Sequence, residues 1–144
     1  MIAVDTNILV LAHREESPLH APARRRLSDL AMGDAAWAVP VFCLAEFVRV
    51  ATHPKIFDPP STLNEALEAI EGLLESETIR VLTPGHRYPA LFARAVREAD
   101  ARGNLAFDAQ IAAVCREQGV SRLLTLDRDF SRFAGIEIAD LEEP

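Results

Sequence analysis

Short apolar runs alternate with longer amphipathic segments along the chain. The runs at 2–4, 36–39, 78–82 and 122–126 have the length and composition of buried strands, and a fifth short strand is predicted at 136–138. The segments between them repeat apolar side chains at helical spacing. They predict helices at about 6–13, 17–32, 41–52, 62–76, 91–99 and 107–119.

Three local signals refine these helices. Thr62 and Glu65 have the spacing of a capping box at the start of a helix. Pro40 suits the first turn of the helix that carries "VFCLAEFVRVAT". Ser17 and Pro18 are expected to open the second helix.

Strands that alternate with helices predict an α/β fold. We expect a three-layer sandwich, in which a central parallel sheet of four to five strands is flanked by helices on both faces. No internal repeat or long linker divides the sequence, so residues 1–140 are predicted to form one domain, followed by a tail at 141–144.

Composition limits the function classes. The formal net charge of −7 argues against a broad nucleic-acid-binding surface, although it leaves room for an enzyme that meets nucleic acid through bound metal ions. The sequence has neither a signal-peptide pattern nor an apolar run of about 18 residues, which predicts a cytoplasmic location without a membrane span. Cys43 and Cys115 lie in apolar helical sequence and are predicted to be buried thiols.

Polar side chains follow two of the predicted strands directly. In an open parallel sheet, ligands bind beyond the carboxyl ends of the strands, where the strand order reverses. The residues to consider are therefore 5–7, "DTN", and 127–129, "DRD".

Four acidic residues follow or interrupt apolar sequence, where a carboxylate is costly to bury: Asp5, Glu46, Asp108 and Asp127. Two such charges 5 Å apart would repel by roughly 3 kcal/mol at an effective dielectric constant of 20. A cation would relieve this repulsion, and oxygen ligands without His or Cys suit Mg²⁺ or Mn²⁺. Such a site can activate water and neutralise a phosphate, so the set indicates phosphodiester hydrolysis.

Each acid also has a structural alternative. Asp5 can cap the helix at 6–13, and Glu46 can face solvent. Asp108 can be a first-turn residue that the helix dipole stabilises. Asp127 and Asp129 can both be turn residues. Because Asp127 leaves its strand first, we assign it to the metal site and expect Asp129 to cap the short "FSRF" turn.

Four segments carry a family resemblance: "VDTNILV", "AEFVRVATHPKIF", "RGNLAFDAQIAA" and "TLDRDFSRF". In this order and spacing, from residue 1 to about 140, they resemble the PIN-domain ribonucleases, and most of all the VapC toxins of bacterial toxin–antitoxin pairs. The resemblance implies four magnesium-binding catalytic carboxylates: Asp5, Glu46, Asp108 and Asp127. It also implies three supporting polar residues: Asn7, Thr125 and Asp129.

The same resemblance implies partners. It suggests an RNA substrate, such as transfer RNA or another structured RNA, and a homodimer. It also implies a VapB-type antitoxin whose C-terminal segment covers the active site. Arg49 and Arg128 are expected to line the approach to the site.

Two other functions stay open. One is a PIN-domain nuclease of RNA processing that has no antitoxin. The other is a phosphoacceptor signalling domain or phosphatase on a similar sheet. That class needs a lysine past a late strand or a second Asp two residues after the first, whereas Lys55 lies elsewhere and Asn7 follows Asp5 at that spacing.

Overall fold

The computed structural model describes residues 1–143. The strands are β1 (Ile2–Val4), β2 (Trp37–Pro40), β3 (Ile79–Leu82), β4 (Arg122–Leu124) and β5 (Glu137–Ala139). The helices are α1 (Thr6–His13), α2 (His20–Met32), α3 (Phe42–Ala51), α4 (Leu63–Leu74), α5 (Tyr88–Ala99) and α6 (Leu105–Glu117). A short 3₁₀ helix, η1 (Arg128–Arg132), lies between β4 and β5.

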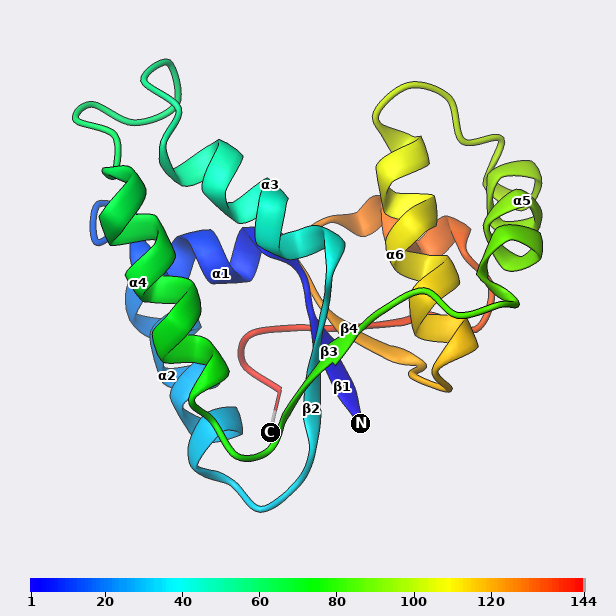
Figure 1. Cartoon of the computed structure of the whole chain (residues 1–144), viewed down its shortest axis with the longest axis horizontal. Coiled ribbons are helices and arrows are strands. Elements are labelled where there is room, and N and C mark those ends of the chain that lie inside the picture. Colours follow the sequence, from blue (N-terminus) through cyan, green and yellow to red (C-terminus); the bar gives the residue numbers. More distant parts are fainter. Residues whose placement is uncertain (144) are drawn as a thin grey trace.

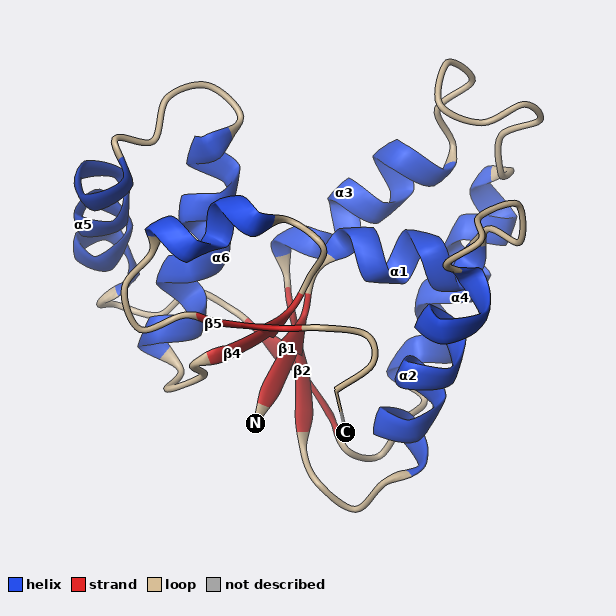
Figure 2. Ribbon diagram, turned by 180° about the vertical axis from the view of Figure 1, so that it is seen from behind, coloured by secondary structure: helices blue, strands red, loops and turns tan. Residues whose placement is uncertain are grey.

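The five strands form one parallel sheet in the order β3-β2-β1-β4-β5. Helices α1 to α4 cover one side of this sheet, and α5 and α6 cover the other (Figures 1 and 2). The strands are almost wholly buried at the centre, as expected for a parallel sheet between two helical layers. The predicted three-layer α/β sandwich is therefore confirmed.

The strand order reverses between β1 and β4. From β1 the chain moves to β2 and β3 on one side, and it returns to place β4 on the other side of β1. Val4 pairs with Leu124, so the two strands end level with each other. The residues that follow them meet at the carboxyl edge of the sheet, where the sequence predicted a site.

Pro40 differs from its expected place in a helix. It is the last residue of β2 and pairs with Leu82, while α3 begins two residues later. The backbone N–H groups of Trp37 and Val41 both point to β3, so the nitrogen of residue 40 faces β1. The pairing of β1 with β2 has already ended at Ala38, and the missing N–H of proline therefore costs no sheet hydrogen bond.

Several other element boundaries differ from the predictions: α5 begins at Tyr88 and α6 at Leu105, and two further differences have a visible cause. Helix α2 starts at His20 because the Ser17 hydroxyl accepts a hydrogen bond from the Leu19 backbone at 3.1 Å, which holds residues 17–19 in a turn. Strand β4 ends at Leu124 rather than at residue 126. The Thr125 hydroxyl and the backbone of Leu126 instead contact side chains that follow β1.

Helix α4 begins with the predicted capping box. The Thr62 hydroxyl accepts from the Glu65 backbone at 3.1 Å, and the Glu65 carboxylate accepts from the Thr62 backbone at 3.2 Å. The helix leaves three leucines exposed: Leu63, Leu67 and Leu74. Its apolar residues thus reach beyond what the core covers.

Three further features concern the membrane, the cysteines and the predicted tail. None of the helices within residues 1–143 has the length and apolar character needed to cross a bilayer. Cys43 and Cys115 are buried free thiols, as predicted. Of the predicted tail 141–144, Leu141 packs against the core, and Pro144 lies outside the described residues.

Candidate functional site

A cleft of about 770 Å³ opens at the carboxyl edge of the sheet. Its walls come from α3 and α6, which lie on opposite sides of the strands in Figure 1, and from the segment after β4. Four predicted site residues line it: Glu46, Asp108, Asp127 and Asp129. The fold therefore brings together acids that are up to 83 positions apart in the sequence, and Asp5 lies buried beneath them at 6% exposure.

Asp5 serves both the helix and the site. Its Oδ1 accepts from the Thr6 backbone at 2.7 Å, which caps α1. Its Oδ2 accepts from the Thr125 hydroxyl at 2.7 Å and from Asn7 Nδ2 at 3.3 Å. The two roles considered from sequence are thus compatible.

Burial raises the pKa of Asp5 to about 6. Hydrogen bonds from Thr125 and Thr6 act in the opposite direction, and the negative charges of Glu46 and Asp127 add to the increase. The Asp5 carboxylate is therefore held in place by donors but is short of positive charge.

Thr125 joins both sides of the site through one fully buried hydroxyl. It donates to Asp5 Oδ2 and accepts from Asn7 Nδ2 at 3.1 Å and from the Asp127 backbone at 3.0 Å. These bonds use the one donor and both acceptor positions of the hydroxyl. The two residues expected to support the site, Asn7 and Thr125, accordingly connect the end of β1 to the segment after β4.

Replacing Thr125 by valine is expected to destabilise the fold by about 1–3 kcal/mol, because the buried partners lose their hydrogen bonds while the volume is kept. Loss of the donor to Asp5 also removes an interaction that lowers its pKa. The pKa of Asp5 should therefore rise further. Urea unfolding and NMR titration of the Asp5 carboxyl carbon measure the two effects, and Thr125→Ser should retain both wild-type values.

Glu46 projects from α3 into the cleft. It accepts a hydrogen bond from the Thr6 hydroxyl at 3.2 Å and lies 3.8 Å from Arg49, one turn later. Its side chain is 38% exposed, so it is neither fully solvated nor buried. Arg49 lines the same cleft, as the sequence predicted.

Asp108 stands in the first turn of α6 and has no hydrogen bond or ion pair within residues 1–143. Burial raises its pKa to about 7, and the charges of Asp127, Asp5, Glu46 and Asp129 contribute in that order. Four acids thus act on Asp108 with no cation to offset them. This is the strongest electrostatic sign of a cation site in the cleft.

Asp127 and Asp129 exchange the capping role assigned from sequence. Asp127, not Asp129, is the N-cap of η1, and its Oδ1 accepts from the Asp129 backbone at 2.9 Å. Asp129 is exposed, lies in the first turn of η1 and is 3.7 Å from Arg132. The expectation that Asp129 caps this turn was wrong, because the residue that leaves the strand first also precedes the first helical N–H groups.

Arg128 also differs from its expected position. Its guanidinium pairs with Asp140 at 2.7 Å, and it is not among the residues that line the cleft. Arg49 is therefore the arginine that contributes to the cleft.

Two contributions to the cleft were not predicted from sequence. Thr6 was among the residues to consider, but its support of Glu46 through its hydroxyl was not foreseen. The cleft is also lined by residues just before Asp108, namely Asn104, Leu105 and Phe107. The signal that could have identified Phe107 was an aromatic side chain next to an acid in the first turn of a helix.

The residues fit a hydrated hard cation. Among residues 1–143, no three His, Cys, Asp or Glu side chains are grouped closely enough to hold an ion by themselves. Mg²⁺ keeps several of its waters and uses one or two carboxylates, which these oxygen donors provide. Asp108 and Asp127 could bind such an ion directly or through water, with Asp5 and Glu46 behind them.

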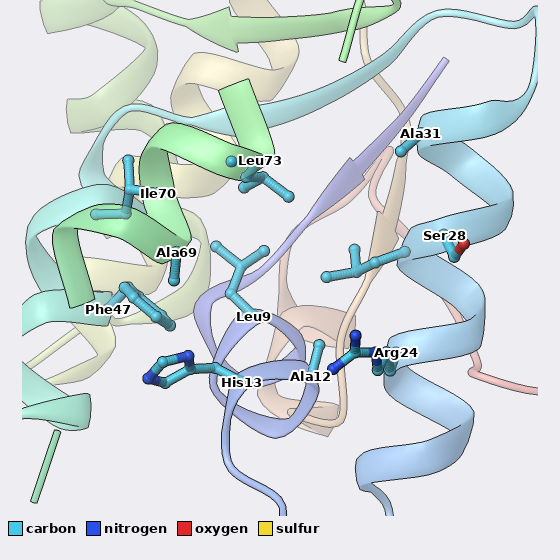
Figure 3. A pocket seen from close by; sticks show the side chains of 12 residues that line it. Leu9, Ala12, His13, Arg24, Ser28, Ala31, Phe47, Ala69, Ile70 and Leu73 are labelled. Atoms are coloured by element: carbon cyan, nitrogen blue, oxygen red, sulfur yellow. The ribbon is translucent and has the colours of Figure 1, made fainter. Parts of the chain in front are cut away.

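A second hollow lies away from these acids. It is a groove of about 440 Å³ between α2 and α4, with α1 beneath. Figure 3 shows Leu9, Ile70 and Leu73 around it, with His13 and Arg24 at one side. This groove offers mainly apolar surface and has no carboxylate in its lining.

Comparisons with known proteins identify the family of the chain. A profile of the PIN domain matches residues 2–136. Ribonuclease VapC43 of Mycobacterium tuberculosis is 37% identical over 133 residues, which are 92% of this chain and 90% of that protein. Ribonuclease VapC31 of the same organism is 35% identical over 136 residues, covering 94% and 95% of the two chains.

Solved structures share the fold at lower identity. A chain of VapBC2 from Rickettsia felis, bound to a DNA fragment from its promoter, superposes with a TM-score of 0.69 at 18% identity, over 97% of this chain and 98% of that one. VapC20 of M. tuberculosis, a toxin that cleaves the sarcin–ricin loop, gives a TM-score of 0.66 at 21% identity, over 94% and 98%. The family expected from the sequence motifs is confirmed: the chain belongs to the PIN-domain family and is a homologue of the VapC ribonucleases.

Proposed function

We propose that this protein is a magnesium-dependent endoribonuclease and the toxic component of a VapBC toxin–antitoxin pair. The observation that carries the proposal is the cleft in which Glu46, Asp108 and Asp127 meet above the buried Asp5. Burial, together with repulsion from the neighbouring acids, raises the pKa of Asp108 to about 7, as expected of a site built for a cation. The family relatives are named ribonucleases, which supports RNA as the substrate.

The chemistry follows from the positions of these residues. A bound Mg²⁺ or Mn²⁺ would supply a water activated for attack and would neutralise the scissile phosphate. Asp108 and Asp127 would hold the cation from two walls of the cleft. Behind them, the hydrogen bonds that Thr125 and Thr6 donate to Asp5 favour its ionised form and oppose the effect of burial. Glu46, held by Thr6, orients water at the third wall.

In-line attack on phosphorus breaks the bond to the 3′-oxygen. The products are then a 3′-hydroxyl end and a 5′-phosphate end. Since the protein carries a net charge of −7, the cation and Arg49, rather than the general surface, attract the RNA backbone. Structured RNA such as transfer RNA is the proposed substrate.

A VapB-type antitoxin is the proposed protein partner. The structural neighbours include VapBC complexes from R. felis and Salmonella typhimurium, which favours a toxin over an RNA-processing nuclease without an antitoxin. The apolar groove between α2 and α4 and the exposed leucines of α4 provide surface that a partner would cover. We expect a short upstream gene that encodes a DNA-binding protein, and this protein should co-purify with the chain. The proposed state of the toxin is a homodimer.

Removing divalent metal is expected to stop RNA cleavage. Purified protein is incubated with transfer RNA in excess chelator, and Mg²⁺ is then restored. Cleavage should fall to the level of a protein-free sample and return with Mg²⁺. The new 3′ ends should be hydroxyls, whereas a contaminating metal-independent ribonuclease would leave cyclic phosphates. Activity that persists in chelator, with cyclic ends absent, would contradict the proposal.

A further inference from the structure

Among the Phe, Tyr and Trp side chains within residues 1–143, Phe107 is the one that is exposed. It is 60% exposed, whereas each of the others is at least partly buried. An exposed ring contributes little to folding, because its apolar area stays in water. Its exposed position therefore indicates a role other than core packing.

The ring lies where the RNA would pass. Phe107 directly precedes Asp108 in the first turn of α6, and both line the cleft. Across the cleft, α3 contributes Phe42 and the exposed Arg49. An aromatic surface thus stands one residue from a proposed metal-binding carboxylate.

The negative charge of the cleft makes an uncharged binding surface useful for RNA. The cleft lining contains four carboxylates and a single cationic side chain, Arg49, which is itself 3.8 Å from Glu46. Phosphate contacts alone therefore offer little attraction beyond the metal. Stacking on an aromatic ring does not depend on charge and is available to every base, because each has a flat π face.

We propose that Phe107 is a stacking platform for an unpaired nucleobase next to the scissile phosphate. This rests on the proposed ribonuclease function and adds a requirement to it: the nucleotide at the cut must be single-stranded, in a loop or at an end. A base that remains in a duplex keeps both faces stacked on its neighbours and cannot reach the ring.

Binding of two short RNAs tests this platform. One is a fluorescent single-stranded RNA of mixed sequence, and the other has the same backbone with abasic central nucleotides. Ca²⁺ replaces Mg²⁺, and a gel verifies that the RNA stays intact. Phe107→Ala should weaken binding of the base-bearing RNA at least about fivefold, and leave the abasic RNA unchanged. Phe107→Trp should bind both RNAs within about twofold of wild type.

Met32→Ala is the matched control, because Met32 is 83% exposed on α2 and lies outside the cleft. It should bind both RNAs as the wild type does. Equal weakening of both RNAs by Phe107→Ala, or no weakening, would overturn the platform. A change in sedimentation mass for this variant would also overturn it and would assign the ring to a contact between copies.

The platform and the proposed function fail separately. If the wild type cleaves RNA with Mg²⁺ but Phe107→Ala binds like wild type, only the platform is wrong. If the wild type binds RNA through Phe107 but never cleaves it with Mg²⁺, the ribonuclease proposal is wrong, and Phe107 is an RNA-stacking residue with no scissile phosphate beside it.

Discussion

Asp108→Asn is expected to reduce RNA cleavage by about 10³-fold and, at the same time, to stabilise the metal-free protein. The loss arises because an amide cannot replace a carboxylate that holds the cation. The gain arises because Asp108 forms no hydrogen bond or ion pair within residues 1–143, so a neutral side chain of equal size removes repulsion without removing a contact. Opposite effects on activity and stability are typical of a functional site.

The stabilisation should depend on pH in a defined direction. The pKa of Asp108 is raised to about 7 in the folded state, from an ordinary value of 3.8. Below about pH 3 the group is mostly protonated in both the folded and the unfolded states, and the mutation changes little. As pH rises from 4 to 7, only the unfolded state loses its proton readily, and the wild type loses stability. The advantage of Asp108→Asn should therefore be fully present above pH 7.

Urea unfolding in chelator at pH 4 and pH 8 measures this difference. At pH 8 the variant should be more stable by about 2 kcal/mol, since each unit of pKa shift corresponds to about 1.4 kcal/mol and partial exposure reduces the total. Asp34→Asn, at an exposed carboxylate in the turn after α2, should show no such gain. An equal gain at pH 4 and pH 8 would mean that charge is not the cause.

Added Mg²⁺ should make the wild type more stable than Asp108→Asn, which reverses their order in chelator. A ligand that binds only the folded state stabilises it by about 2.7 kcal/mol at 100 times its dissociation constant. Saturating Mg²⁺ should therefore raise the stability of the wild type more than that of Asp108→Asn. An equal response in both proteins would remove Asp108 from the proposed metal site.

The sequence was sufficient to predict the frame of the site because that frame depends on local patterns. Val4 ends an apolar run, and an acid follows it, so the rule for parallel sheets placed Asp5 at the carboxyl edge without any structure. Asp127 was placed in the same way, although two residues leave the sheet before it. Placing Glu46 and Asp108 in the site required more than a local pattern, because a helix pattern alone does not show which face of the helix meets the sheet edge.

Two of the features that the sequence did not predict were decided by tertiary contacts. Pro40 has the local features of a helix start, but the early end of the β1–β2 pairing allows it in a strand. The strand predicted through residue 126 stops early because the backbone N–H of Leu126 donates to the Asn7 side chain, while the Thr125 hydroxyl contacts Asp5 and Asn7. In each case the deciding partner is more than 30 residues away along the chain.

Mutation should distinguish the roles of the two aspartates that follow β4. Asp127→Asn and Asp127→Ala should both reduce cleavage by about 10²-fold or more, because each removes a negative charge that faces the cation. They should differ in stability, since the asparagine oxygen can still accept from the Asp129 backbone and cap η1, whereas alanine cannot. The free energy of unfolding of Asp127→Ala should be lower than that of Asp127→Asn by about 1 kcal/mol.

Asp129→Ala supplies the comparison at the neighbouring acid. Asp129 is exposed, and its contact with Arg132 is a surface ion pair of 3.7 Å, so its loss should change stability by less than about 1 kcal/mol. Its carboxylate lines the cleft without capping η1, and cleavage should fall less than in either Asp127 variant. Urea unfolding in chelator and cleavage rates in Mg²⁺ measure both quantities. If Asp129→Ala were the less active protein, the cation would be held by Asp129, and Asp127 would serve the 3₁₀ helix alone.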